Sequence, residues 1–310
     1  MSIDFEKVKA GIESMRTALD LERYVMKTYD SSDIFYGHGS PDPLGEAELT
    51  VAHVMGLQLS DLGHFAGALS TPEERAEIAE LVRRRIEERI PLAYLTNTGW
   101  FCGFPFYVDR RVIVPRSPIG ELIESGFEGI LPHDPENVLD LCTGSGCIAI
   151  ATALRYGQQV NVDAADISAE ALEVCGINIG RFGCEESVFP ILSDLYENID
   201  PSVRYDLIVS NPPYVDAEDL GDMPKEYSYE PGIALGSGED GLDITRRIIR
   251  EAPEHLADDG VLLIEVGNSV YNLMDQYDWD FHLAELKKGG SGVFYMTRDE
   301  AAEFRDRFLA

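Results

Sequence analysis

The spacing of apolar residues predicts helices in the first third of the chain. Between Ile3 and Tyr29 apolar residues recur at roughly helical intervals, which is typical of a helix with one buried face. The pattern stops at the prolines and glycine of residues 41–45, and then resumes over 47–57 and 72–90. Thr71 offers a helix cap, with Pro72 at the first helical position and Glu74 completing a capping box. We therefore expect a small helical domain over residues 1–93.

The pattern changes over residues 94–116. Glycines and a proline separate short aromatic and β-branched runs, among them Trp100-Phe101 and Phe104 to Val108. Such runs between turn residues predict a β-hairpin. We expect this hairpin to link the helical domain to the rest of the chain.

Residues 117–310 alternate short apolar runs with helical patterns. The predicted strands are 138–142, 160–167, 188–192, 206–210, 261–266, 282–287 and 293–297. Strands that alternate with helices indicate a mainly parallel sheet covered on both faces, an α/β fold. Only Lys288–Gly292 separates the last two strands, and so short a connection predicts an antiparallel pair. The expected domain is a seven-stranded α/β sheet that ends in an antiparallel hairpin.

The charge of the chain is unusual. Asp and Glu number 56 against 25 Lys and Arg, which gives a formal net charge of −31. Phosphate binding needs clustered basic residues, so we expect no stable nucleic-acid partner; the acidity favours a basic partner, or reflects salt adaptation or solubility. No apolar run is long enough to cross a membrane, and charges occupy the start of the chain, so we expect a cytoplasmic protein. The odd number of cysteines without a paired spacing predicts no metal site, and the sequence assigns no oligomeric state.

A glycine-rich segment, Cys142-Thr143-Gly144-Ser145-Gly146, follows the first strand of the predicted sheet. In such sheets ligands bind at the carboxyl ends of the strands, where this segment lies. Asp166 ends the second strand twenty residues after Gly146, a spacing that suits an acid that binds ribose hydroxyls. The pattern favours a nucleotide-type cofactor, although a tight turn of purely structural use, or a dinucleotide, would show the same glycines.

Two further acids flank this segment. Asp140 lies inside the first strand and is a candidate to orient the glycine loop or to meet a cationic group. Asp194 follows the third strand and is a candidate acceptor for an adenine amino proton. For both, a surface or capping role is the structural alternative.

The segment Asn211-Pro212-Pro213-Tyr214 follows the fourth strand. Prolines have no N–H donor, so the carbonyls here have no competing local donor. A planar amino group needs two acceptors at fixed angles, which the Asn211 side-chain oxygen and the Pro212 carbonyl offer. Tyr214 is placed to pack against such a flat group and exclude water. Alone, the segment is also typical of an ordinary turn at a strand end.

Taken together, these segments resemble the S-adenosylmethionine-dependent methyltransferases that modify planar nitrogens. The resemblance to the protein-(glutamine-N5) methyltransferases covers the whole chain, including 114–116, 230–235, 240–243 and 265–267. It implies a Rossmann-like class I methyltransferase domain, with S-adenosylmethionine as cofactor. It also implies that the helical domain recognises the substrate. The implied catalytic residues are Asn211, Pro212 and Tyr214, and the substrate-binding set adds Pro213 and Arg116. The implied cofactor contacts are Asp140, Cys142, Thr143, Gly144, Ser145, Gly146, Asp166, Ile167, Asp194, Leu195 and Asn211.

Within this family, residues 101–123 are similar to the branch that methylates the third large-subunit ribosomal protein, a basic protein substrate. The other branch methylates the Gly-Gly-Gln glutamine of peptide-chain release factors, and it usually has Arg-Pro-Asp-Thr-Glu where this chain has residues 116–121. Leu195 departs from the aromatic residue that release-factor enzymes often carry, which affects the expected adenine contact.

Three other hypotheses are open to the sequence. A DNA adenine-N6 methyltransferase shares the Asn-Pro-Pro-Tyr chemistry, but it needs a basic groove from which to flip a base, and the net charge of −31 opposes one. A nicotinamide dehydrogenase leaves Asn211–Tyr214 and the terminal hairpin unexplained. A non-catalytic module of the same fold would not need the intact Asn211–Tyr214 set.

Overall fold

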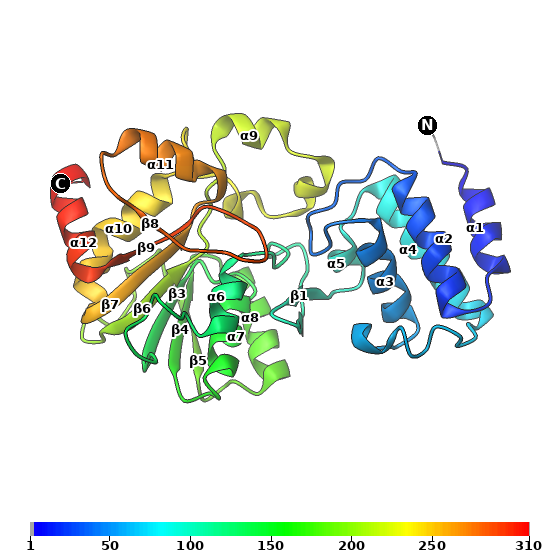
Figure 1. Cartoon of the computed structure of the whole chain (residues 1–310), viewed down its shortest axis with the longest axis horizontal. Coiled ribbons are helices and arrows are strands. Elements are labelled where there is room, and N and C mark those ends of the chain that lie inside the picture. The colour runs from blue at the N-terminus through cyan, green and yellow to red at the C-terminus, as the bar shows by residue number, and fades with distance from the viewer. Residues whose placement is uncertain (1–2, 310) are drawn as a thin grey trace. The chain divides into compact units, whose positions relative to one another are not determined.

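The computed structural model describes residues 3–309, which divide into two compact units. The helical unit contains the described residues up to Gly99 together with a second segment, Pro224–Tyr229. The second unit contains Trp100–Met223 and the described chain from Glu230 onward, and we call it the catalytic unit after the role that the sequence predicts for it. Figure 1 shows both units, with the described part of the helical unit up to Gly99 in blue and cyan. The different roles that the sequence assigns to residues 1–93, 94–116 and 117–310 stay predictions.

The helical unit begins with two helices where the apolar spacing runs on from Ile3 to Tyr29. The chain breaks at residues 15–17 because Thr17 starts a new helix. Its side chain accepts the N–H of Asp20, and the Asp20 carboxylate accepts the N–H of Thr17, a reciprocal capping box. The helices of this unit are α1 (Phe5–Ser14), α2 (Ala18–Asp30), α3 (Pro43–Val54), η1 (Leu59–Asp61), α4 (Pro72–Arg83), η2 (Arg84–Glu88), α5 (Leu92–Leu95) and η3 (Lys225–Tyr229).

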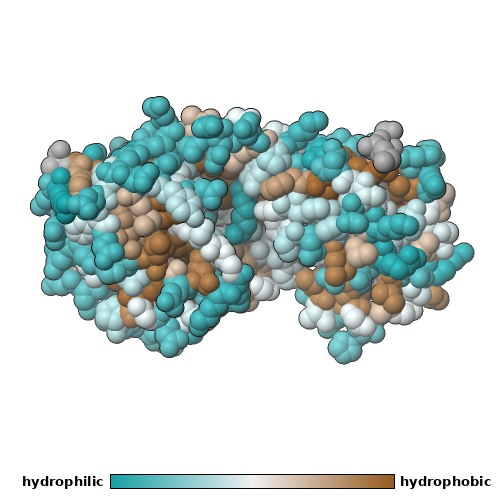
Figure 2. Space-filling model, turned by 45° about the horizontal axis from the view of Figure 1, so that its top comes forward, coloured by the Kyte–Doolittle hydropathy of each residue, from teal (hydrophilic) through white to brown (hydrophobic). Residues whose placement is uncertain are grey.

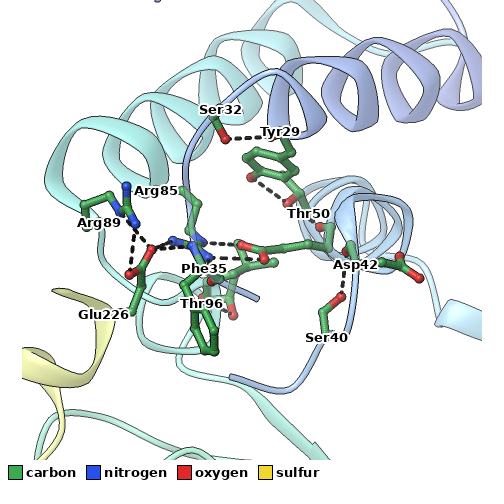
Figure 3. A network of polar contacts seen from close by, with 12 residues as sticks. Tyr29, Ser32, Phe35, Ser40, Asp42, Thr50, Arg85, Arg89, Thr96 and Glu226 are labelled. Atoms are coloured by element: carbon green, nitrogen blue, oxygen red, sulfur yellow. Dashed lines mark hydrogen bonds and ion pairs between the residues drawn. The ribbon is translucent and has the colours of Figure 1, made fainter. Parts of the chain in front are cut away.

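Several charged side chains are buried within the helical unit, and Arg85, Glu46 and Glu226 among them form ion pairs. Arg85 is 1% exposed and forms ion pairs with Glu46 and with Glu226, whose side chain is fully buried. Arg89 reaches the same Glu226 carboxylate at 2.8 Å. The backbone N–H of Phe35 also donates to Glu226 at 2.8 Å. Figure 3 shows Arg85 and Arg89 converging on Glu226, so the segment 224–229 is held in the helical unit by buried charge.

The catalytic unit contains the predicted seven-stranded sheet, in the order β5-β4-β3-β6-β7-β9-β8. Neighbouring strands from β5 to β7 pair in parallel, whereas β9 is antiparallel to both β7 and β8, which confirms the terminal hairpin. β8 is shorter than the predicted 282–287. The strands are β3 (Asn137–Leu141), β4 (Asn161–Asp166), β5 (Val188–Leu192), β6 (Tyr205–Ser210), β7 (Leu256–Glu265), β8 (His282–Leu283) and β9 (Val293–Thr297), and a separate hairpin contains β1 (Gly99–Phe101) and β2 (Phe104–Phe106).

Helices cover both faces of the sheet, so each face buries a separate apolar core. Val138 of β3 belongs to one core, and its neighbour Leu139 belongs to the other, because successive side chains of a strand point to opposite faces. Figure 1 shows the helices on either side of the strands. The helices of the catalytic unit are α6 (Ile119–Ser125), α7 (Cys147–Arg155), α8 (Ala169–Phe182), α9 (Ala217–Asp222), η4 (Gly232–Ala234), α10 (Asp243–His255), η5 (Gly267–Ser269), α11 (Val270–Gln276), α12 (Arg298–Phe304) and η6 (Arg305–Leu309).

The face of the molecule in Figure 2 is largely hydrophilic. Figure 2 shows teal residues over most of the visible face, interrupted by smaller brown areas. Exposed apolar side chains include Leu69 of the helical unit and Tyr271 of the catalytic unit. Within residues 3–309, none of the helices combines the length and the apolar character that a membrane span requires.

Candidate active site

The parallel strands bring the predicted site residues to one edge of the sheet. β3 is flanked by β4 and β6, in a register that aligns Leu141 with Ala165 on one side and with Ser210 on the other. The glycine loop, Asp166 and Asn211 directly follow or end these three strands. Because the carboxyl ends of parallel strands share an edge, residues far apart in the sequence converge there.

The glycine loop turns sharply between β3 and α7. Gly144 and Gly146 have φ values of +54° and +78°, a conformation that favours glycine. A β-carbon at Gly146 would lie 2.6 Å from the sulfur of Cys175, whereas one at Gly144 would meet no protein atom within 4 Å. Gly146 is therefore required by packing inside the protein. At Gly144 there is open space, so a ligand can approach the protein backbone closely.

Asp140 stands at the base of this loop and is fully buried. One carboxylate oxygen accepts the hydroxyl of Thr143 at 2.6 Å and the N–H of Ala149 at 3.1 Å. The other oxygen is buried and has no hydrogen-bond partner among the described residues. Burial raises the pKa of Asp140 to about 7, opposed by these two hydrogen bonds and reinforced by the nearby Asp166. An orphaned buried oxygen fits a site that a cationic ligand completes.

Asp166 ends β4, where the sequence predicts it. Its carboxylate accepts the N–H of Gly144 at 2.9 Å and the N–H of Ser168 at 2.8 Å, so it also orients the glycine loop. Burial raises the pKa of this carboxyl, and the two N–H donors oppose the shift. Ile167 beside it is 53% exposed. The predicted ribose contact of Asp166 and the predicted cofactor contact of Ile167 stay predictions.

Two further predicted cofactor contacts, Asp194 and Leu195, follow the third predicted strand, β5. Asp194 follows β5 and forms an ion pair with Arg247 of α10 at 2.9 Å. Leu195 has a φ of +50°, and its side chain is buried in the core rather than presented at the surface. The predicted adenine contacts of both residues stay predictions.

The segment Asn211–Tyr214 begins where β6 ends. Ser210 ties this strand end to β3, because its hydroxyl donates to the carbonyl of Leu141 at 2.7 Å. The partly exposed Asn211 side chain and the Pro212 carbonyl make no hydrogen bond to any residue within 3–309. Two adjacent acceptor groups are thus left for an incoming molecule.

Two features of the site were not expected from the sequence. The Tyr214 hydroxyl donates to the buried carboxylate of Glu265, at the end of β7, at 3.0 Å. The motif Glu265-Val266-Gly267, at the carboxyl end of a predicted strand, was the signal that could have revealed this contact. Arg116, predicted to bind substrate, pairs with the fully buried Glu230 carboxylate at 2.5 and 2.8 Å. Its substrate contact stays a prediction.

The charge of the site suits S-adenosylmethionine, which carries a positive sulfonium and an ammonium group. Asp140 and Asp166 both accept hydrogen bonds from the glycine loop. Within 3–309 no group of three or more His, Cys, Asp and Glu side chains could hold a metal ion. Asp140 and the open space at Gly144 would hold the methionine part and Asp166 the ribose.

The seven-stranded sheet, its antiparallel hairpin and this edge define a class I methyltransferase, as the sequence predicted. The family model described as methyltransferase small domain matches residues 128–223, and the PrmC N-terminal domain model matches residues 31–96. A ribosomal protein uL3 glutamine methyltransferase from Neisseria gonorrhoeae is 43% identical over 93% of this chain and 96% of its own length. One from Neisseria meningitidis is 42% identical, over 93% and 95%. The chain belongs to the ribosomal protein uL3 glutamine methyltransferase family.

Solved structures with some likeness are more distant. A methyltransferase from Pyrococcus furiosus has a TM-score of 0.45 and 17% identity, over 63% of this chain and 89% of that one. A Thermus thermophilus 16S rRNA methyltransferase in complex with AdoMet and guanosine has a TM-score of 0.43 and 16% identity, over 64% and 49%.

Proposed function

We propose that this protein transfers a methyl group from S-adenosylmethionine to the side-chain amide nitrogen of a glutamine in ribosomal protein uL3. The observation that carries the proposal is the pair of free acceptors at Asn211 and Pro212, beside a glycine loop that fits the donor. The relatives named as uL3 glutamine methyltransferases, matched over nearly their whole length, support the choice of substrate.

The chemical difficulty is that an amide nitrogen is a weak nucleophile, because its lone pair is delocalised into the carbonyl. The Asn211 oxygen and the Pro212 carbonyl each accept one N–H of the substrate amide. Together they orient the nitrogen and increase its negative character. S-adenosylmethionine, when bound, supplies an electrophilic methyl group.

Orientation is the main catalytic contribution that we assign to the protein. Holding two reactants in a reactive geometry contributes about 7–11 kcal/mol in favourable cases. The new carbon–nitrogen bond forms as the carbon–sulfur bond of the donor breaks, which leaves S-adenosylhomocysteine, and the methylated nitrogen releases one proton to solvent. Tyr214 packs beside the flat amide and keeps water away from it.

The setting of the reaction follows from the same observations. A net charge of −31 favours encounter with a basic protein and disfavours stable binding of nucleic acid. We further propose that the enzyme acts in the cytoplasm, where its substrate is synthesised, and that the helical unit recognises that substrate.

The test is transfer of labelled methyl from S-adenosylmethionine to purified uL3, with release factor and duplex DNA as competing acceptors. Label in uL3 alone, located on a glutamine by mass spectrometry, is the expected result. Label only in release factor moves the protein to the other branch of the family, and label in DNA rejects protein methylation.

Asn211→Ala tests the acceptor role in the same assay. Turnover should fall at least about a hundredfold, because the amide loses an orienting partner, while donor affinity stays unchanged. Asn161→Ala is the matched control, since Asn161 is exposed at the start of β4, away from the carboxyl edge. Full turnover in the Asn211 variant contradicts the proposed role.

A further inference from the structure

Glu265 is a buried acid that the proposed chemistry does not use. It ends β7, with its side chain 4% exposed, at the same edge of the sheet as Asn211. Its two oxygens have different donors: Tyr214 donates to one at 3.0 Å, and the hydroxyl of Ser117 donates to the other at 2.5 Å. The carboxylate thus connects the active-site tyrosine to the segment that leads into α6.

The Ser117 hydroxyl is itself fixed. Besides donating to Glu265, its oxygen accepts the backbone N–H of Ile119 at 3.1 Å, at the start of α6. The direction of the Ser117 hydroxyl is therefore set by the helix start. Glu265 receives one donor from a rigid element, which leaves its other oxygen oriented toward Tyr214.

The surroundings of Tyr214 are shaped to its backbone and ring. The Tyr214 carbonyl accepts the hydroxyl of Ser269 at 2.7 Å. A β-carbon at Gly241 would lie 2.2 Å from that carbonyl oxygen, and one at Gly267 would lie 2.6 Å from a carbon of the Tyr214 ring. Both glycines have positive φ, at +77° and +48°, so a side chain there would be strained as well as obstructed.

These contacts bring together, around Tyr214, segments that lie far apart in the sequence. Tyr214 is surrounded by the motifs at 240–243 and 265–267, which provide Gly241, Gly267 and Glu265. The segment after Arg116 supports Glu265 through Ser117. A ring held from its hydroxyl, its carbonyl and one face has little freedom. Asn211 and Pro212 precede Tyr214 in the same short segment, so fixing the tyrosine also restricts the two acceptors.

We infer that Glu265, supported by Ser117, is a positioning residue that acts through Tyr214. It keeps the substrate amide and its two acceptors in the arrangement that methyl transfer needs. The inference rests on the proposed function and adds a residue to it. Glu265 does not touch the substrate. Its effect on methyl transfer is therefore present only while the Tyr214 hydroxyl is present.

The experiment compares Glu265→Met, which keeps the shape but removes the acceptors, with Glu265→Gln, which keeps one acceptor oxygen. Each change is made in the wild-type background and in Tyr214→Phe. We expect kcat for uL3 to fall between about tenfold and about a hundredfold in Glu265→Met, and less in Glu265→Gln, with donor affinity unchanged. In the Tyr214→Phe background the Met substitution should change kcat by less than about twofold.

Thr245→Val is the control for burial alone. Thr245 is fully buried in α10, and its hydroxyl has no partner among the described residues, so its replacement should leave kcat unchanged. A purely structural role of Glu265 would lower the melting temperature without changing kcat of the folded enzyme. Full kcat in Glu265→Met, or an equal loss with and without the Tyr214 hydroxyl, overturns the inference.

A second measurement does not depend on the substrate. A fluorotyrosine placed at position 214 reports the environment of the ring by ¹⁹F NMR. Its resonance should shift toward that of an exposed ring in Glu265→Met and stay in place in Thr245→Val. An unchanged resonance in the Met variant contradicts the positioning role. A wild-type enzyme that fails to methylate uL3 contradicts the proposed function and leaves this measurement decisive for Glu265.

Discussion

The buried acids of the helical unit have different partners from those at the carboxyl edge of the sheet. In the helical unit, Glu46 and Glu226 each contact the guanidinium of Arg85, and Glu226 also binds Arg89. Burial raises the pKa of Glu226, but the hydrogen bonds from Arg89, the Phe35 N–H and Arg85 outweigh it, and the net shift is downward. Glu226 is therefore an ionised part of the folded structure, whereas burial raises the pKa of Glu46 against the charge and the hydrogen bond of Arg85.

At the carboxyl edge of the sheet, the buried acids Asp140 and Glu265 accept hydrogen bonds from hydroxyl and N–H groups rather than from arginines, and Arg116 acts on Glu265 only through its charge. Burial raises the pKa of Asp140 to about 7, and it also raises the pKa of Glu265 against the hydrogen bonds from Ser117 and Tyr214. Hydroxyl groups donate to both oxygens of Glu265, whereas one buried oxygen of Asp140 has no hydrogen-bond partner among the described residues. Buried acids that pair with arginine thus stabilise the folded structure, whereas buried acids without such a pair indicate where a ligand binds or a reaction takes place.

Removal of Arg85 should have the largest effect on stability. Arg85→Met leaves Glu46 without its cation, and breaking a buried pair in this way costs about 3–5 kcal/mol of the free energy of unfolding. Urea denaturation measures the loss. Below the unfolding transition, donor affinity should stay unchanged, because none of the predicted donor contacts belongs to the helical unit.

Two further variants test whether the loss comes from the buried charge. Asp258→Asn removes the exposed partner of Arg298 and should leave stability unchanged, because an exposed ion pair contributes little. The double variant Glu46→Met/Arg85→Met should lose less stability than Arg85→Met, because no uncompensated charge remains at Glu46. If the single and double variants lose the same amount, Arg85 stabilises the unit by packing rather than by charge.

The next effect concerns Asp140 and pH. Because its pKa is raised from an ordinary 3.8 to about 7, the folded donor-free protein holds a proton there that the unfolded chain has released. Stability should therefore fall as pH rises from about 4 to about 7, on the order of 1.4 kcal/mol per pH unit at most. Asp140→Asn should remove this dependence, so that the variant gains stability relative to the wild type at pH 8 but not at pH 4.

Donor affinity should move in the opposite direction in that variant. Asp140→Asn loses the carboxylate that we expect to face the cationic donor, and its affinity for S-adenosylmethionine should fall, as calorimetric titration will show. An Asn variant that binds the donor as tightly as the wild type would mean that Asp140 only orients the glycine loop. Equal pH dependence of stability in both proteins would contradict the assignment of the raised pKa.

The smallest effect separates the two glycines of one loop. Gly146→Ala places a methyl group 2.6 Å from the sulfur of Cys175 and should cost stability through that clash, besides about 1–2 kcal/mol of left-handed backbone strain. Gly144→Ala has similar strain but open space around it, so it should lose more donor affinity than stability. Thermal melts and donor titrations of both variants test the contrast, which fails if their order is reversed.

Much of the fold could be predicted because it depends on local patterns. Apolar runs of strand length alternate with helical spacing, so all seven strands of the sheet, and their antiparallel end, could be read along the chain. The convergence of the glycine loop, Asp166 and Asn211 also followed, since parallel strands present their carboxyl ends at one edge. The interrupted first helix was missed because Thr17 is an inconspicuous capping residue within a continuous apolar pattern.

The sequence by itself therefore determined which residues form the strands and which short segments gather at the active edge. Only the tertiary structure decided the long-range partners. Arg85 and Glu226 are 141 residues apart, and Tyr214 and Glu265 are 51 apart, separations at which no periodicity constrains pairing. A charged side chain reveals its role only through its surroundings: the same carboxyl group is a structural ion beside Arg85 and an unpaired acid beneath the glycine loop.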